Sequence, residues 1–216
     1  MIPWICSRCG EDQIAFGRLV PAETLCHACL DAQRPPSFTE VDAGIPERYR
    51  NLTRASWEAH FQRAWPTNIE SWSGTPHWVA LWGATGTGKT SLATILLAEH
   101  IRAGRWGRWI SGPGLSHRIR RDFANAEDVI DPLLVTPLLV LDEPLTGAAA
   151  DWYTERILLI TRSRDERGLP TIVTSQLLPE LLDVPHAIAS PSVLSRWLSG
   201  LHLPIHGDDA RLQKAL

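Results

Sequence analysis

The sequence predicts an α/β fold in which helices cover both faces of a parallel β-sheet. Short, continuously apolar segments alternate along the chain with segments of helical length, and this order is typical of a parallel sheet buried on both faces. A glycine-rich run over residues 83–90 also follows one apolar segment directly and precedes a helical one. The 216 residues provide for one medium-sized domain and a small additional module.

Composition excludes several classes of protein. The apolar content of 44% is ordinary for a folded domain, and no apolar run approaches the roughly 20 residues that span a membrane. The N-terminus lacks a charged start followed by an apolar stretch, so we expect no signal peptide, no membrane partner and a cytoplasmic location. Because the net charge is −3, any nucleic-acid binding must come from a local basic patch.

The glycine-rich run matches the phosphate-binding pattern G-x-x-x-x-G-K-[S/T]. Backbone N–H groups of such a loop, and the N-terminus of the following helix, converge on phosphate oxygens. Lys89 is one of only two lysines, with Lys214, in a chain that otherwise uses arginine, and its compact charge suits the β- and γ-phosphates. Thr90 supplies a hydroxyl for Mg²⁺. We therefore predict nucleotide binding by Gly83, Ala84, Thr85, Gly86, Thr87, Gly88, Lys89 and Thr90.

The hydrophobic pattern of the sequence, and the glycines that interrupt it, predict the strands and helices around this loop. We expect a strand over 77–82 before the loop and a helix over 91–101 after it, ending near Gly104. A strand over 107–111 and a helix over 115–126 come next. A further strand over 138–141 runs into an acidic pair, a helix over 152–167 stops at Gly168, and a strand over 171–174 follows.

The acidic pair, Asp142 and Glu143, is the predicted second half of the site. It lies about fifty residues after the phosphate loop and directly follows an apolar strand. Asp142 would hold Mg²⁺ through water, and Glu143 would polarise the attacking water as a general base. A general base at this place favours hydrolysis of a nucleotide over transfer to a small acceptor.

All four cysteines fall within the first 29 residues, as C-x2-C-x16-C-x2-C. This spacing is typical of a structural zinc site with four thiolate ligands, whereas two disulfides would not suit a cytosolic chain. Its predicted ligands are Cys6, Cys9, Cys26 and Cys29, with His27 as an alternative ligand. So small a module would draw most of its folding free energy from the metal. Its acidic, thiolate-rich surface favours contact with protein over contact with phosphates.

A basic segment over residues 102–121 holds six arginines, no acidic residue, and both Trp106 and Trp109. On its predicted helix, a buried stripe repeats every four residues: Leu115, Ile119 and Phe123. Three arginines lie off this stripe: Arg118, Arg120 and Arg121. They form either an ordinary solvated helix face or a patch that contacts single-stranded nucleic acid, with tryptophan stacking.

Together these motifs resemble those of the DnaC/DnaI helicase loaders and the related IstB-type transposition ATPases, both of the AAA+ class. The resemblance covers roughly residues 43–212. It rests on the order of motifs along the chain: residues 44–50 (GIPERYR) before Trp57 and Phe61, the LLVLDE strand, residues 167–171 before IVTSQL, residues 195–197 (SRW) and residues 207–211 (GDDAR).

The sequence divides into three regions: a zinc-binding module over 1–36, a linker and lead-in segment over 37–75, and an ATPase core over 76–216. The resemblance implies that this core is a P-loop AAA+ domain with a much reduced lid, and a zinc module before such a core is similar to the DnaI-type arrangement. It implies that Arg196 reaches the γ-phosphate held by a neighbouring subunit, so that subunits assemble head-to-tail. It also implies that Gln176, where loaders commonly place asparagine, and Arg211 sense the nucleotide phosphates.

The leading functional hypothesis is an ATP-dependent loader of the replicative helicase onto single-stranded DNA, using ATP, Mg²⁺ and Zn²⁺. Its zinc module would bind the helicase. One alternative is an IstB-like ATPase that assists a transposase. Another is a nucleotide-switched DNA-binding adaptor without hydrolysis, which Glu143 opposes because a pure switch needs no general base.

Overall fold

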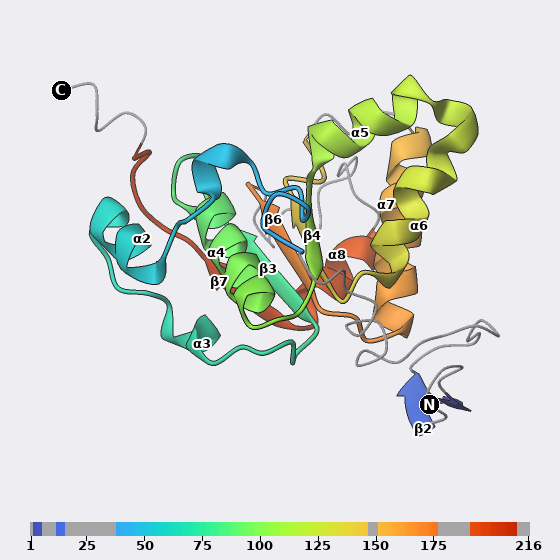
Figure 1. Ribbon diagram of the computed structural model, residues 1–216, viewed down its shortest axis with the longest axis horizontal. Helices are drawn as coiled ribbons and strands as arrows, with labels where there is room; N and C mark the ends of the chain where they lie inside the picture. The colour runs from blue at the N-terminus through green and yellow to red at the C-terminus, as the bar shows by residue number, and fades with distance from the viewer. Residues whose placement is uncertain (1, 6–11, 16–37, 147–150, 177–190, 211–216) are drawn as a thin grey trace.

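The computed structural model describes residues 2–5, 12–15, 38–146, 151–176 and 191–210. Near the N-terminus, β1 (Ile2–Ile5) and β2 (Asp12–Ala15) form an antiparallel pair. The described residues from 38 onward form an α/β core (Figure 1). The four cysteines of the predicted zinc site and Arg211 lie outside the described residues, so these predictions remain predictions.

A five-stranded parallel sheet forms the centre of the core. Its strands lie in the order β4-β5-β6-β3-β7, and every neighbouring pair is parallel. Their bounds are β3 (Trp78–Trp82), β4 (Gly107–Ser111), β5 (Leu138–Asp142), β6 (Thr171–Ser175) and β7 (Leu201–Pro204). The sequence predicted the first four within a residue or two and missed β7. Since all the strands are parallel, the loops that follow them meet at one edge of the sheet.

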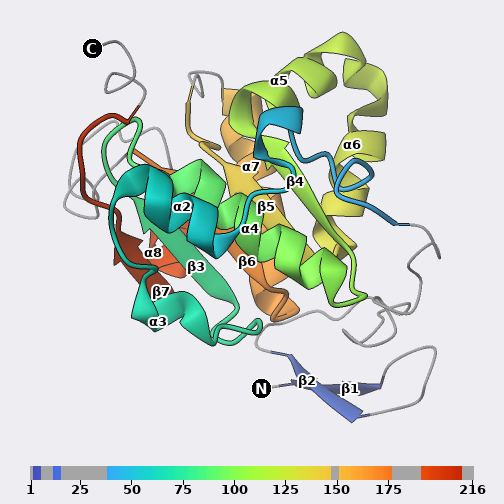
Figure 2. The ribbon, with the colours of Figure 1, turned by 60° about the vertical axis from the view of Figure 1, so that its left-hand side comes forward.

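Helices cover both faces of the sheet, as predicted. One face carries α4 (Lys89–Arg102) with α2 (Arg54–Phe61) outside it. The other face carries α7 (Asp151–Glu166) and α8 (Pro191–Leu198), and α5 (Gly112–Arg121) and α6 (Ala126–Val135) continue that layer (Figure 2).

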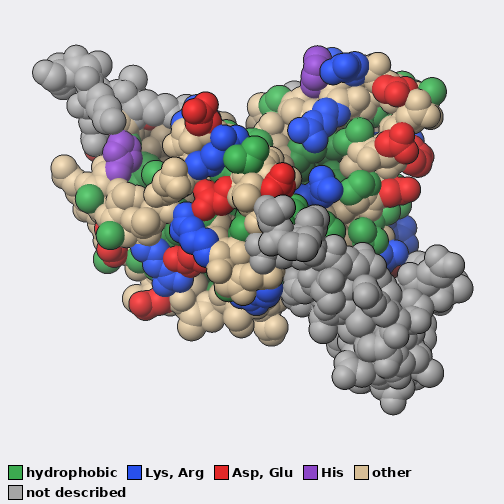
Figure 3. Space-filling view, in the orientation of Figure 1, with side chains coloured by type: hydrophobic (Ala, Val, Ile, Leu, Met, Phe, Trp, Pro, Cys, Tyr) green, Lys and Arg blue, Asp and Glu red, His purple; other side chains and the backbone are tan. Residues whose placement is uncertain are grey.

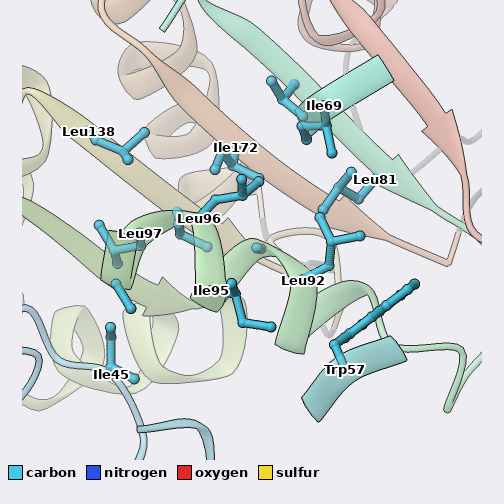
Figure 4. Close-up of a cluster of buried hydrophobic side chains, with 14 of the residues drawn as sticks. Ile45, Trp57, Ile69, Leu81, Leu92, Ile95, Leu96, Leu97, Leu138 and Ile172 are labelled. Atoms are coloured by element: carbon cyan, nitrogen blue, oxygen red, sulfur yellow. The ribbon is translucent and has the colours of Figure 1, made fainter. Parts of the chain in front are cut away.

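Alternating side chains along the strands build two hydrophobic clusters, one on each face. On β5, Leu138 and Val140 pack toward α4, whereas Leu139 and Leu141 pack toward α7 and α8. The α4 side also takes in Ile45 and Trp57 from the chain before the sheet (Figure 4). This explains why the strands are apolar at nearly every position, as expected of a parallel sheet covered on both sides.

The lead-in segment packs on α4 and is partly helical. It contains η1 (Glu47–Tyr49), α2 and α3 (Thr67–Glu70). Thr53 and Ser56 form a reciprocal capping box at the start of α2. The guanidinium of Arg54 in α2 pairs with the carboxylate of Glu99 in α4, at 2.8 Å. The ion pair joins the start of α2 to the last turn of α4.

The predicted helix over 115–126 is wrong in its second half. α5 ends at Arg121, a short η2 (Phe123–Asn125) follows, and α6 begins at Ala126. Asp122 leaves helical geometry, and its carboxylate accepts two hydrogen bonds from Asn125 Nδ2. Phe123 is therefore 55% exposed instead of buried. The sequence did not predict α6, which holds Pro132 in its interior, where proline disfavours a helix.

The chain after β7 carries no helix within the described part, residues 205–210. No helix among the described residues is long and apolar enough to cross a membrane.

Candidate nucleotide-binding site

One cavity, of about 540 Å³, lies at the carboxyl edge of the sheet. The phosphate loop after β3, the acidic pair after β5 and Gln176 after β6 all line it. The lead-in segment also lines the cavity, through Arg48, Tyr49, Leu52, Ser56, Trp57, His60 and Phe61, as does Ala210 from the chain after β7. The structure thus brings together predicted residues from three motifs, of which Thr85 and Gln176 are 91 positions apart.

The phosphate loop turns tightly between β3 and α4, as the motif requires. Gly86 and Gly88 have φ of +77° and +97°, which a residue with a Cβ rarely adopts. A Cβ at Gly86 would lie 1.8 Å from a carboxylate oxygen of Asp209. Lys89 is the first residue of α4, so the loop runs directly into the helix N-terminus. This is the backbone arrangement that binds phosphate groups.

The Lys89 side chain is 5% exposed and folds over the loop. Its ammonium donates hydrogen bonds to the carbonyl oxygens of Gly83, at 2.9 Å, and Ala84, at 2.8 Å. A carboxylate oxygen of Glu143 lies 3.6 Å away. The predicted phosphate ligand is therefore in the cavity, close to the predicted general base.

Asp142 joins the phosphate loop to the middle of the sheet. One carboxylate oxygen accepts hydrogen bonds from Thr90 Oγ1, at 2.7 Å, and from Thr174 Oγ1, at 2.8 Å. Burial raises the pKa of the Asp142 carboxyl, while the two hydroxyls and the charge of Lys89 oppose that shift. A threonine hydroxyl beside a carboxylate is a set of oxygen ligands that fits Mg²⁺.

Glu143 adopts a left-handed backbone conformation, with φ of +50°. Its N–H donates to Thr174 Oγ1 at 2.9 Å, and its side chain remains 21% exposed. Burial raises the pKa of the Glu143 carboxyl; Lys89 opposes the shift and Asp142 adds to it. A raised pKa strengthens a carboxylate as a base, which suits the predicted role.

Gln176 contacts the phosphate loop directly. Its side-chain carbonyl accepts a hydrogen bond from Thr85 Oγ1 at 3.0 Å. The longer side chain thus still reaches the loop at a position where the resemblance led us to expect asparagine.

Arg196 lies at the opposite, amino edge of the sheet. Its Nε donates to Asp165 at 3.1 Å, and Asp165 also contacts His77 and Trp78, at the start of β3. Burial opposes ionisation of Asp165, but the hydrogen bonds from His77 and Trp78 and the charge of Arg196 outweigh it and lower its pKa. The structure therefore does not bring Arg196 to the chain's own phosphate loop.

The basic residues Arg118, Arg120 and Arg121 are exposed on α5, and basic side chains are visible on the surface over this helix (Figure 3). Trp106 and Trp109, the tryptophans of the basic segment, are half-buried and pack against the core. A different aromatic pair lies beside the arginines. Arg120 lies 5.7 Å from the ring centre of Trp152, which packs edge-on against Phe123.

Sequence reasoning missed the residues that hold the phosphate loop from outside. Trp57 and Arg63 contact it from the lead-in segment, and Asp209 and Ala210 from the chain after β7. The family-like segments around positions 57 and 207–211 pointed to these regions. No local pattern identified their contact with the loop, because the partners lie far apart in sequence.

No protein-family model and no curated protein matches this sequence. Solved structures do match its fold. A DnaC helicase loader matches with a TM-score of 0.55 and 21% identity, covering 74% of this chain and 100% of that chain. DnaI matches with a TM-score of 0.54 and 18% identity, covering 81% of this chain and 91% of that chain.

The replication initiator DnaA, bound to AMPPCP and single-stranded DNA, matches with a TM-score of 0.56 and 19% identity over 81% of this chain. The chain spans only about half of the DnaA structure, 51% of its length. These likenesses show the fold alone, which is a parallel five-stranded sheet flanked by helices, with the phosphate loop between β3 and α4.

Proposed function

We propose that this protein is an ATP-dependent loader of the replicative helicase onto single-stranded DNA. The proposal that the protein depends on ATP rests on one observation: the phosphate loop, Asp142 and Glu143 line the same cavity. The fold likeness to DnaC and DnaI, over 100% and 91% of the solved chains, supports the loader role.

The chemistry follows from the residues around the cavity. The loop N–H groups and the Lys89 ammonium bind the β- and γ-phosphates, for which Lys89 exchanges its present carbonyl contacts. Mg²⁺, held by Thr90 and Asp142, would neutralise phosphate charge. Glu143 accepts a proton from the attacking water, and its raised pKa favours that transfer.

A second copy of the chain completes the site in this proposal. Arg196 would stabilise the charge that develops on the γ-phosphate of a neighbouring subunit, which makes hydrolysis depend on head-to-tail assembly. Its exposure of 32% and its place at the amino edge of the sheet support an outward role.

The remaining contacts of the proposed loader fall outside the cavity. The arginines of α5, with Trp152 and Phe123 beside them, would bind single-stranded DNA through phosphate contacts and stacking. The four cysteines would bind Zn²⁺ and form the module that contacts the helicase.

Nucleotide binding is tested by calorimetric titration of ATP with Mg²⁺ into the wild type and the Lys89→Ala variant. We expect the wild type to bind and the variant to lose about a hundredfold or more in affinity, because a buried charge facing the phosphates is lost. Lys214→Ala removes the other lysine and is the matched control, which should bind like the wild type. Equal binding by wild type and Lys89→Ala would contradict the assigned site.

The helicase partner is tested with the full-length chain. We expect it to capture a purified replicative helicase, and the Cys26→Ser/Cys29→Ser variant to lose capture while retaining ATP binding. Failure of the wild type to bind helicase would refute the loader role. Capture of a purified transposase in its place would favour the IstB-like alternative.

A further inference from the structure

The carbonyl groups of the phosphate loop accept hydrogen bonds from two segments that are far apart in sequence. The guanidinium of Arg63 donates to Thr87 O, and Trp57 Nε1 donates to Gly88 O at 3.1 Å. On the other side, Ala210 N donates to Gly86 O at 3.3 Å. The lead-in segment and the chain after β7 therefore hold the loop between them.

These bonds are made to the carbonyl groups of the loop, whereas phosphate binds to its N–H groups. A peptide unit is planar, so fixing the direction of one carbonyl also fixes the N–H of the next residue in the opposite direction. Thr87 O shares its peptide unit with Gly88 N–H, and Gly88 O shares its unit with Lys89 N–H. Holding these carbonyls thus orients two of the N–H groups that a phosphate-binding loop presents to its anion.

Arg63 is itself held in place from several directions. Its guanidinium lies 5.0 Å from the Trp57 ring centre and 5.1 Å from that of Phe61. A Cβ built at Gly207 would be 3.1 Å from an Arg63 nitrogen, so the chain after β7 also packs against the guanidinium. Burial lowers the pKa of Arg63, which reflects the loss of water around this charge.

We propose that Arg63 and Trp57 are positioning residues that orient the loop N–H groups toward the nucleotide polyphosphate. This inference rests on the proposed nucleotide site. It adds that the lead-in segment, by orienting the loop, increases the affinity of that site for the nucleotide. Arg63 makes the larger contribution. Gly88 O also accepts hydrogen bonds from Leu92 N, at 2.9 Å, and Ser91 Oγ, at 3.2 Å, so it stays partly held without Trp57.

A competing explanation is that these residues contact the base of the nucleotide. Trp57 and Phe61 line the cavity, and aromatic rings readily stack on bases. The two roles differ in one measurable respect. Residues that orient the loop affect every ligand with a polyphosphate, including inorganic tripolyphosphate, whereas residues that contact the base affect only the nucleotide.

The experiment compares binding of ATP and of tripolyphosphate by the full-length wild type and three variants: Arg63→Ala, Arg63→Lys and Trp57→Phe. Two controls alter neighbouring residues that do not bond to the loop. Arg54→Ala removes the ion pair of α2 with Glu99. Trp65→Phe removes a buried indole N–H with no hydrogen-bond partner among the described residues. Thermal unfolding without ligand checks that each variant folds.

We expect Arg63→Ala to weaken binding of both ligands about three- to tenfold, which is less than the full effect of losing a charge-assisted hydrogen bond, because the bond acts on the ligand only through the loop. Trp57→Phe should weaken binding of both ligands by a smaller factor. Arg63→Lys should bind both ligands more tightly than Arg63→Ala but less tightly than the wild type. If Arg63→Ala does not fold, the Arg63→Lys and Trp57→Phe variants still test the inference. Both controls should bind like the wild type.

Three results overturn the inference. The first is unchanged tripolyphosphate affinity with weakened ATP affinity, which assigns the residues to the base. The second is an equal loss in Arg54→Ala and Trp65→Phe, which reduces the effect to general packing. The third is wild-type affinity in both Arg63 variants. If the wild type itself binds neither ligand, the proposed nucleotide site fails as well, so the two failures are distinguishable.

Discussion

The two edges of the central sheet differ in what their charged side chains contact. At the carboxyl edge, Lys89 and Glu143 face one cavity and lie 3.6 Å apart. At the amino edge, Arg196 and His77 both contact Asp165. A five-residue strand separates the edges by roughly 16 Å, farther than an arginine side chain reaches. In our proposal, therefore, one edge binds the nucleotide of its own chain and the other edge serves the nucleotide of a neighbour.

Arg196→Ala tests this division with the largest expected effect. We expect unchanged ATP affinity and a loss of about a thousandfold in hydrolysis at protein concentrations that support assembly, as for other arginines supplied between subunits. Steady-state turnover measured across a range of protein concentrations checks this. Arg162→Ala, which removes an arginine 59% exposed on α7, is the matched control. A large loss of ATP affinity in Arg196→Ala would place its effect within its own subunit.

Glu143→Gln tests the carboxyl edge alone. The variant should retain ATP binding and lose about a hundredfold or more in kcat, since the amide cannot accept the proton. In the wild type, burial raises the pKa of Glu143 above its ordinary 4.5, so hydrolysis should fall on acidification at a higher pH than for an ordinary glutamate. A pH–rate profile measures this fall. Full turnover by Glu143→Gln would remove the general base from the account.

Arg118→Ser/Arg121→Ser tests whether the basic helix at the carboxyl edge contacts DNA. If both arginines contact phosphates, affinity for single-stranded DNA should fall, and the slope of log affinity against log salt should decrease by about 1.4. Fluorescence anisotropy at several salt concentrations measures both quantities. Arg156→Ser/Arg162→Ser removes the same charge from α7 and should have little effect. An unchanged slope in the α5 variant would indicate an ordinary solvated helix face.

Asp165→Asn tests how the amino edge holds Arg196, with the smallest expected effect. Weakening a partly exposed ion pair should let Arg196 engage a neighbour at about two- to fivefold lower protein concentration. The lowered pKa of Asp165 means that its ionised form stabilises the fold above its unfolded pKa, near 3.8. The stability difference from the wild type should therefore shrink as the pH falls below that value. Turnover against protein concentration, and thermal unfolding against pH, check the two parts.

The sequence predicted the carboxyl edge better than the amino edge for a physical reason. The phosphate loop and the acidic pair are local patterns whose chemistry depends on residues next to each other in the chain. The strands around them are continuously apolar because helices cover both faces of the sheet, and this pattern predicted a parallel sheet. The spacing of Asp142 from Lys89 along the sequence was enough to predict that the two residues lie in one site.

Contacts between distant segments could not be predicted in this way. Arg63 reaches Thr87, and the carboxylate of Asp209 packs against Gly86, although no periodicity connects these positions. Arg164 is a further case. It is completely buried and donates to the carbonyls of residues 133, 136 and 170, and burial lowers its pKa to about 9. Nothing in its local sequence distinguishes it from an exposed arginine on a helix.

The most direct test of a nucleotide site shared between the two edges is hydrolysis by a mixture of inactive variants. Lys89→Ala lacks a working carboxyl edge but keeps Arg196, and Arg196→Ala has the opposite defect. In an equal mixture that assembles head-to-tail at random, about a quarter of the contacts combine two intact edges. We predict that the mixture regains about a quarter of wild-type turnover. Turnover no greater than the sum of the two variants alone would contradict the account.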